Sequence, residues 1–286
     1  MSPRRDPLYA VRQRLARSRV RRLLPGWMRR SIRAALDAPA FIPIVSDVRS
    51  LAMLLPPKQA ASAAAAVPVR LRRLGGGAVY VRPGTADVAV VRNIMLTLPH
   101  LPPEEFLPAD VRLVWDLGAH IGVSAADYAT LWPDAHIIAV ELEPTNAELC
   151  RRNLAAFGQR CEVIEGAVWP HDGRVAIRMP ADPDGLSTNA YSASEGVTTD
   201  GVPAISLHTL LARAGDRATV DVVKLDVEGA ERQILRENTD WAEHVRSIVV
   251  EVHGDYAPEQ CEADLRALGF SNVGAGHAPD VVAASR

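Results

Sequence analysis

The chain of 286 residues has few cysteines, no long apolar run and almost no lysine. Its cysteines, Cys150, Cys161 and Cys261, are too few and too scattered for a disulfide framework, and no CxxC pair suggests a zinc site. No apolar run approaches the roughly 18 residues that cross a bilayer, and the N-terminus lacks the apolar core of a signal peptide. These absences predict a protein of the reducing cytoplasm.

Positive charge is scarce outside the first 36 residues. That segment holds eleven arginines and one acid, a charge of +10, whereas the other 250 residues carry −12. An acidic body lacks the basic groove that a nucleic-acid partner needs. The basic segment fits contact with the acidic body, a second subunit, an anionic membrane or an acidic carrier. Contact within a homo-oligomer is our first hypothesis, and peripheral membrane contact stays open.

Hydrophobic periodicity divides the chain in two. The first 75 residues predict a basic helical extension, with helices over 8–24, 27–37 and 44–55. Glycines 75–77 between two alternating runs predict a β-hairpin, and Thr85 is a candidate N-cap for a helix over 86–98. We therefore predict an N-terminal extension over 1–75 and a second domain over 76–286.

From residue 111 onward short apolar strands alternate with helices. The strands are expected at 111–117, 136–141, 161–168, 220–226 and 247–252, followed by two more before the C-terminus. Such alternation predicts a parallel sheet with helices on both faces, and ligands bind beyond the carboxyl ends of its strands. The last two strands have no helix between them, so the final strand is expected to run antiparallel.

The first strand of this series ends in a glycine pair, Gly118 and Gly122. Their GxxxG spacing differs from the GxGxxG of a dinucleotide site, which argues against a nicotinamide-dependent dehydrogenase. Glu141 ends the next strand, 23 residues after Gly118, where an acid accepts hydrogen bonds from ribose hydroxyls. Together they favour a nucleoside ligand without pyrophosphate, and S-adenosylmethionine is the leading candidate.

Charged residues cluster at the end of the strand over 220–226. Lys224, Asp226 and Glu228 are expected on one face of a strand that should be apolar, so these charges need partners or a function. The alternative is capping, because acids at 226, 228 and 231 would suit the positive end of the following helix. The next strand ends in Glu251 and His253, which places an imidazole at the same edge.

The segments DLGAHIG, ELEPTNAELCRRNL, VPAISL, KLDVEGAE and EVH, with RPGTAD upstream, resemble the FkbM-type S-adenosylmethionine-dependent methyltransferases over residues 80–285. The resemblance implies an α/β, Rossmann-like class I methyltransferase fold with a seven-stranded sheet, and methylation of a hydroxyl on a sugar or natural product. It also implies which residues bind the cofactor. Asp116, Gly118, Ala119 and Gly122 would line its methionine end, with His120 in the same loop, and Glu141 would bind the ribose. Gly166 and Ala167 would lie near the adenine, and Lys224, Asp226 and Glu228 would lie near the methyl donor.

Two positions depart from the family pattern. His120 stands where the family usually has Asn, and His208 stands where it commonly has Asp after the VPAISL-type strand. The contact of His120 and the role of that Asp are therefore open. The resemblance does not extend to residues 1–75.

Methylation of an alcohol needs a group that takes its proton. We predict that His253 or Asp226 is this base and that Lys224 orients the site. A second hypothesis is a divalent cation, magnesium or calcium, that holds a diol acceptor. Its ligands would be Asp226, Glu228, Glu251 and His253.

Other functions remain as alternatives. They are N- or carboxyl-methylation of a small molecule or peptide, and non-catalytic nucleoside binding on the same fold. The chain lacks the NPPY-type loop of base amino-methylation. The predicted acceptor is a hydroxylated small molecule, and its predicted contacts are the N-terminal segments and the loop over 180–201.

Overall fold

The computed structural model describes residues 41–54, 65–178, 192–197, 201–215 and 219–286. These residues form two compact units that divide between Thr97 and Leu98. The predicted helices over 8–24 and 27–37 lie outside the described residues, and so does most of the loop over 180–201. Among the described residues no helix is both long and apolar enough to cross a membrane.

The first unit contains the predicted hairpin. Strands β1 (Val67–Arg70) and β2 (Ala78–Val81) pair antiparallel, as the glycine turn predicts. Helix α4 (Val48–Leu54) is shorter than the predicted 44–55, and α5 (Ala86–Thr97) follows the hairpin. Thr85 accepts a hydrogen bond from the Asp87 amide at 3.2 Å, as expected of an N-cap. The predicted domain boundary at 75/76 falls in the turn between these two strands, and it stays a prediction.

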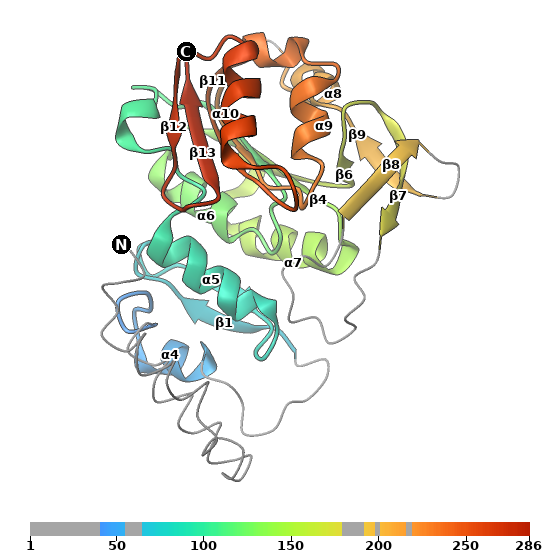
Figure 1. Ribbon diagram of the computed structural model, residues 1–286. Coiled ribbons are helices and arrows are strands. Elements are labelled where there is room, and N and C mark those ends of the chain that lie inside the picture. Colours follow the sequence, from blue (N-terminus) through green and yellow to red (C-terminus); the bar gives the residue numbers. More distant parts are fainter. Residues whose placement is uncertain (1–40, 55–64, 179–191, 198–200, 216–218) are drawn as a thin grey trace, which may run out of the picture. The chain divides into compact units, whose positions relative to one another are not determined.

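The second unit is built on a seven-stranded sheet, in the order β12-β13-β11-β10-β3-β4-β5 (Figure 1). The strands from β11 to β5 are parallel, whereas β13 runs antiparallel to both of its neighbours. Their bounds are β3 Leu113–Leu117, β4 His136–Glu141, β5 Cys161–Glu165, β10 Val220–Leu225, β11 Val245–Glu251, β12 Asn272–Ala275 and β13 Val281–Ser285. The predicted class I methyltransferase fold, with its antiparallel last strand, is confirmed.

The helices cover both faces of this sheet. Helices α6 (Val123–Leu131) and α7 (Pro144–Leu154) connect strands that progress from β3 to β5, whereas α9 (Glu231–Arg236) and α10 (Pro258–Ala267) follow strands that progress the other way. Because parallel crossovers are right-handed, the two pairs lie on opposite faces, as Figure 1 shows. The direction reverses between β3 and β10, and ligands bind at such a switch point.

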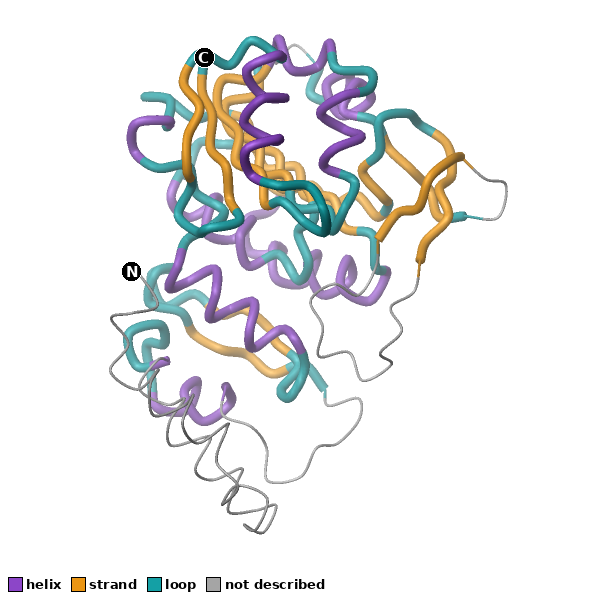
Figure 2. The backbone as a smooth tube through the Cα atoms, in the orientation of Figure 1, coloured by secondary structure: helices purple, strands orange, loops and turns teal. Residues whose placement is uncertain are grey.

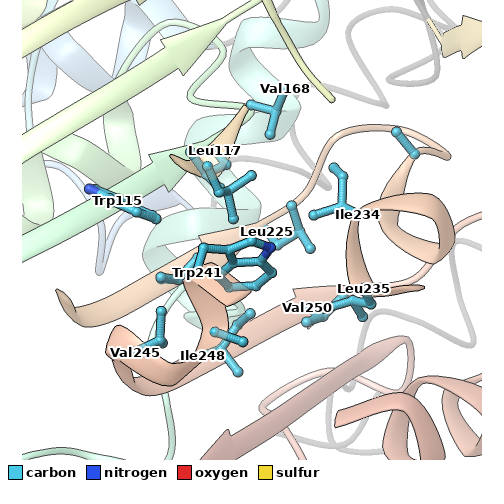
Figure 3. Close-up of a cluster of buried hydrophobic side chains, with 14 of the residues drawn as sticks. Trp115, Leu117, Val168, Leu225, Ile234, Leu235, Trp241, Val245, Ile248 and Val250 are labelled. Carbon is cyan, nitrogen blue, oxygen red and sulfur yellow. The ribbon is translucent and has the colours of Figure 1, made fainter. Parts of the chain in front are cut away.

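Large apolar side chains fix the strands against α9 (Figure 3). Trp115, Leu225 and Ile248 from the sheet, Ile234 from α9, and Trp241 after it are fully buried in one cluster. Burying each such side chain contributes about 1.5–3 kcal/mol relative to exposure. This core holds the carboxyl ends of β3, β10 and β11 at fixed positions.

A second sheet, in the order β6-β9-β7-β8, is inserted between β5 and β10 (Figure 2). Its strands are β6 Ala167–Val168, β7 Gly173–Arg178, β8 Ser192–Val197 and β9 Val202–Ile205, and helix α8 (Leu207–Arg213) follows. The predicted strand over 161–168 therefore breaks at Gly166 into β5 and β6. The prediction of a loop throughout 180–201 is wrong at β8, because Ser192 and Ala193 pair with β7. The sequence of β8, SASEGV, has no alternation of apolar and polar residues, so it did not predict a strand.

Three short 3-10 turns complete the second unit, at Glu104–Phe106, Ala155–Arg160 and Asp240–His244. All three cysteines are free, as their spacing predicts.

Candidate active site

Strand β3 is joined to α6 by a loop in which two positions accept only glycine. Gly118 has φ +82°, and a Cβ built there would lie 1.7 Å from the Asp226 carbonyl oxygen. Gly122 has φ +80°, and its Cβ would lie 2.7 Å from Cys150 Sγ. The glycine loop thus lies closely against the end of β10 and the middle of α7, at the predicted edge of the sheet.

His120 lies between these glycines and also has a left-handed backbone, with φ +50°. Asn, Asp and His are the side-chain residues most often found in this region, Asn above all. The departure from the family's usual Asn is therefore compatible with the same loop conformation. Ala119, beside it, is buried.

Glu141 ends β4 and ties the glycine loop to the start of α7. Its buried carboxylate accepts hydrogen bonds from the His120 amide at 2.7 Å and from the Glu143 amide at 2.9 Å. Burial raises the pKa of Glu141, while the two backbone amides oppose that shift. A carboxylate offers about four acceptor positions, so Glu141 keeps capacity for further donors such as hydroxyls.

Lys224 lies beside Asp116 in the register of β10 and β3. Its buried ammonium donates to the Gly118 carbonyl oxygen at 2.8 Å and forms ion pairs with Asp116 at 3.3 Å and Asp226 at 3.1 Å. Burial alone would lower the pKa of Lys224, but the charges of Asp226 and Asp116 outweigh it and raise the pKa. Asp116 is fully buried and also accepts a hydrogen bond from Ser124 at 2.5 Å. Lys224 therefore joins both carboxylates to the glycine loop.

His253 follows β11 and lies among acidic side chains. Its Nε2 is 3.6 Å from Glu228, 3.7 Å from Asp226 and 3.9 Å from Glu251. Burial alone would lower the pKa of His253, but its hydrogen bond to Glu231 and the surrounding carboxylates raise the pKa to about 9. Asp226, Glu251 and His253 also offer ligand atoms within 4.8 Å of one another, as a cation site would require.

Two carboxyl groups of this cluster, Glu228 and Glu251, resist ionisation. Burial and the neighbouring carboxylates raise the pKa of Glu228 to about 8, and burial with Asp226 raises that of Glu251 to about 7. Both side chains are only about a quarter exposed. A ligand or ion that brings positive charge would therefore be stabilised here.

Most of the predicted site residues lie together at one edge of the sheet, but the backbone conformation at Glu228 differs from the prediction. Strand β10 ends at Leu225, so the chain is not extended through Glu228, which instead has a left-handed φ of +57°. Gly166 forms the bend after β5, where its amide donates to the Glu141 carbonyl oxygen at 2.9 Å, and Ala167 is buried in β6.

Glu231 is a site residue that the sequence did not predict. This acid is fully buried, and its carboxylate oxygen lies 2.9 Å from His253 Nδ1, within hydrogen-bond distance. The signal was present in the charged string KLDVEGAE, but capping explained its last acid equally well.

His208, the other departure from the family pattern, lies in the first turn of α8. Asp172 lies at the same helix start, where it accepts hydrogen bonds from the Ser206 amide at 2.8 Å and the Thr209 hydroxyl at 2.6 Å. An aspartate from another part of the chain thus supplies a carboxylate beside this helix.

Comparison with known proteins agrees with this geometry. The methyltransferase FkbM domain matches residues 116–273, more than half of the chain and from the glycine loop to β12. The chain belongs to the FkbM methyltransferase family. The family is one of methyltransferases, and class I folds of this kind bind S-adenosylmethionine.

One relative within reach of sequence comparison is the hexuronic acid methyltransferase AglP of Haloferax volcanii. It is 24% identical over 151 residues, which cover 51% of this chain and 58% of the relative. The chain thus spans little more than half of that protein's length.

Similar solved structures include precorrin-6y C5,15-methyltransferase from Geobacter metallireducens, with 15% identity, 67% of this chain and 86% of that chain covered, and a TM-score of 0.38. The N-terminal domain of human METTL16 shows 12% identity, 62% coverage of each chain and a TM-score of 0.39. At such scores neither structure bears on the function.

Proposed function

We propose that this FkbM methyltransferase transfers the methyl group of S-adenosylmethionine to a hydroxyl of a sugar-like small molecule. The observation that carries the proposal is His253, an imidazole whose Nε2 faces the edge of the sheet beside Asp226 while its Nδ1 is held by a buried acid. An alcohol is a weak nucleophile until a base takes its proton, and a histidine in this setting provides one. The name of the Haloferax relative supports a sugar-like acceptor.

The residues present fit S-adenosylmethionine. Glu141 keeps acceptor positions at the end of β4, where the ribose hydroxyls would bind. Asp116 and Asp226 both pair with Lys224, so this edge of the sheet carries more negative than positive charge, which suits a cationic sulfonium. When bound, the cofactor supplies an electrophilic methyl group on a sulfonium. We propose that the loop from Gly118 to Gly122 lies along its methionine part. Gly166 and Ala167 would lie near the adenine.

Between the two candidate bases, the geometry favours His253. Asp226 already pairs with Lys224 through Oδ2, and its other oxygen faces His253. We therefore propose that His253 accepts the proton, that Asp226 stabilises the imidazolium, and that Lys224 holds Asp226 in place.

The function is tested with purified protein, S-adenosylmethionine and a set of hydroxylated acceptors that includes hexuronic acids. Titration calorimetry should show cofactor binding, and mass spectrometry should show a gain of one methyl group on a hydroxyl oxygen. A product methylated on nitrogen or on a carboxyl group would favour those alternatives. Cofactor binding without transfer to any acceptor would support a non-catalytic binding protein.

The acidic cluster also supports a divalent cation, magnesium or calcium, that would hold a diol acceptor. A hexuronate would add negative charge beside Asp226, Glu228 and Glu251, so a cation would offset the repulsion. If the cation takes part, exhaustive chelation should abolish methyl transfer, and added Mg²⁺ or Ca²⁺ should restore it. Full activity after chelation would remove the cation from the mechanism while leaving His253 as base.

The predictions for location and partners stay predictions. These are the cytoplasm, a homo-oligomer formed through residues 1–75, and peripheral membrane contact. Gel filtration of the full chain and of a variant lacking residues 1–36 tests whether the basic segment holds a homo-oligomer together. Unchanged assembly of the shortened chain would contradict it.

A further inference from the structure

Glu231 is the acid of KLDVEGAE with the least exposure, 0%, although it begins a helix. Its carboxylate accepts hydrogen bonds from the Val227 amide at 3.0 Å and the Gly229 amide at 2.9 Å. One of its oxygens also lies 2.9 Å from His253 Nδ1, within hydrogen-bond distance. None of the hydrogen bonds recorded for Glu231 in the described structure goes to an amide of α9. Glu231 therefore does not cap its own helix, but joins the loop after β10 to the end of β11.

These contacts fix which ring nitrogen of His253 carries the proton. Two amides donate to the same carboxylate, so its oxygens are acceptors, and an attractive contact at 2.9 Å requires a proton on Nδ1. A neutral imidazole carries one proton only. Neutral His253 therefore has a bare Nε2, the atom that faces Asp226, Glu228 and Glu251.

The same carboxylate shapes the loop that carries Glu228. Val227 and Gly229 both donate to Glu231, and the residue between them adopts a left-handed φ of +57°. That conformation is costly for a residue with a side chain unless its surroundings hold it. The buried Glu231 thus positions both the His253 ring and the loop that carries Glu228.

We propose that Glu231 is a positioning residue, which holds His253 as the Nδ1–H tautomer with its bare Nε2 turned toward Asp226, Glu228 and Glu251. The inference rests on the proposed function only for what Nε2 then does. A base needs this tautomer to accept a proton, and a histidine that binds a cation likewise donates its other N–H to a carboxylate.

The test uses the full chain with ¹⁵N-labelled histidine and needs no substrate. Ring ¹⁵N shifts are recorded over a pH series that extends well above the pKa of about 9, so that the signals of neutral His253 are reached, and a His253→Gln variant assigns them. The wild type should show a protonated Nδ1 and a bare Nε2. In Glu231→Gln the side-chain amide can donate as well as accept, so the Nε2–H tautomer should appear. The matched control is Glu259→Gln, which changes an exposed acid in the first turn of α10 and should leave the signals unchanged.

A wild-type protein with the proton on Nε2 would overturn the assignment, and that measurement does not depend on how the variant folds. An unchanged tautomer in Glu231→Gln would also overturn it. With an active acceptor in hand, Glu231→Gln should lower kcat by about 100-fold and leave the KM for S-adenosylmethionine unchanged. If no acceptor is methylated, the proposed function fails, whereas the tautomer still decides the role of Glu231.

Discussion

Replacing Lys224 with methionine is expected to lower the free energy of unfolding by about 3–5 kcal/mol, because it leaves the fully buried charge of Asp116 without a counterion and leaves the partly buried Asp226 with His253 alone. The variant also loses the hydrogen bond that ties β10 to the Gly118 carbonyl oxygen. Methionine is close to lysine in length and apolar volume, so little of the loss would come from packing. For a unit of this size the midpoint of thermal unfolding should fall by about 6–20 °C.

The control is Arg246→Met on the neighbouring strand. Arg246 pairs with Asp221 at 2.9 Å, but the Arg246 side chain is 45% exposed, and the buried Asp221 keeps hydrogen bonds from the Arg112 and Leu113 amides. Loss of the Arg246 side chain should therefore cost only about 1 kcal/mol. Adding Asp116→Asn to Lys224→Met should restore about 1–2 kcal/mol, because it removes the buried charge that has lost its counterion. Urea denaturation followed by circular dichroism measures all four proteins. Equal losses for Lys224→Met and Arg246→Met would contradict the assignment of Lys224 as the buried counterion.

The fold was accessible from sequence wherever apolar runs were long enough to be buried. Strand β3 reads LVWDL and is buried throughout, which is the pattern of a parallel strand covered on both faces. Strand β8 reads SASEGV and offers no such run, so it could not be told from a loop. Hydrophobic pattern predicts elements that build the main core, and it fails for an inserted sheet with small polar residues.

The candidate site was accessible because parallel strands bring their carboxyl ends together. That rule alone placed Lys224, Asp226, Glu251 and His253 at one edge. It could not show that Glu231 reaches back to His253, since that contact depends on a left-handed turn at Glu228. Sequence spacing identifies the acids, whereas backbone conformation decides which of them touch.

Replacing His253 with alanine is expected to lower kcat for the hydroxyl acceptor by about 10²–10⁴-fold, since a positioned base contributes about that much to proton transfer. The dissociation constant of S-adenosylmethionine should stay within a factor of about three, because none of the hydrogen bonds and ion pairs recorded for His253 among the described residues goes to the glycine loop or to Glu141. Stopped assays and titration calorimetry measure the two quantities separately. Asp226→Asn should also lower kcat, through loss of the charge that stabilises the imidazolium.

The matched control is His171→Ala, which removes an imidazole that is 56% exposed and should leave kcat unchanged. The pH profile gives a second check. A base must be unprotonated, so the wild-type rate should rise with pH while His253 is protonated and level off near its pKa. That pKa is about 9 in the free protein and falls when a cationic ligand binds beside the cluster. The rise should disappear in His253→Ala, and a variant that keeps both full activity and the wild-type profile would exclude His253 as the base.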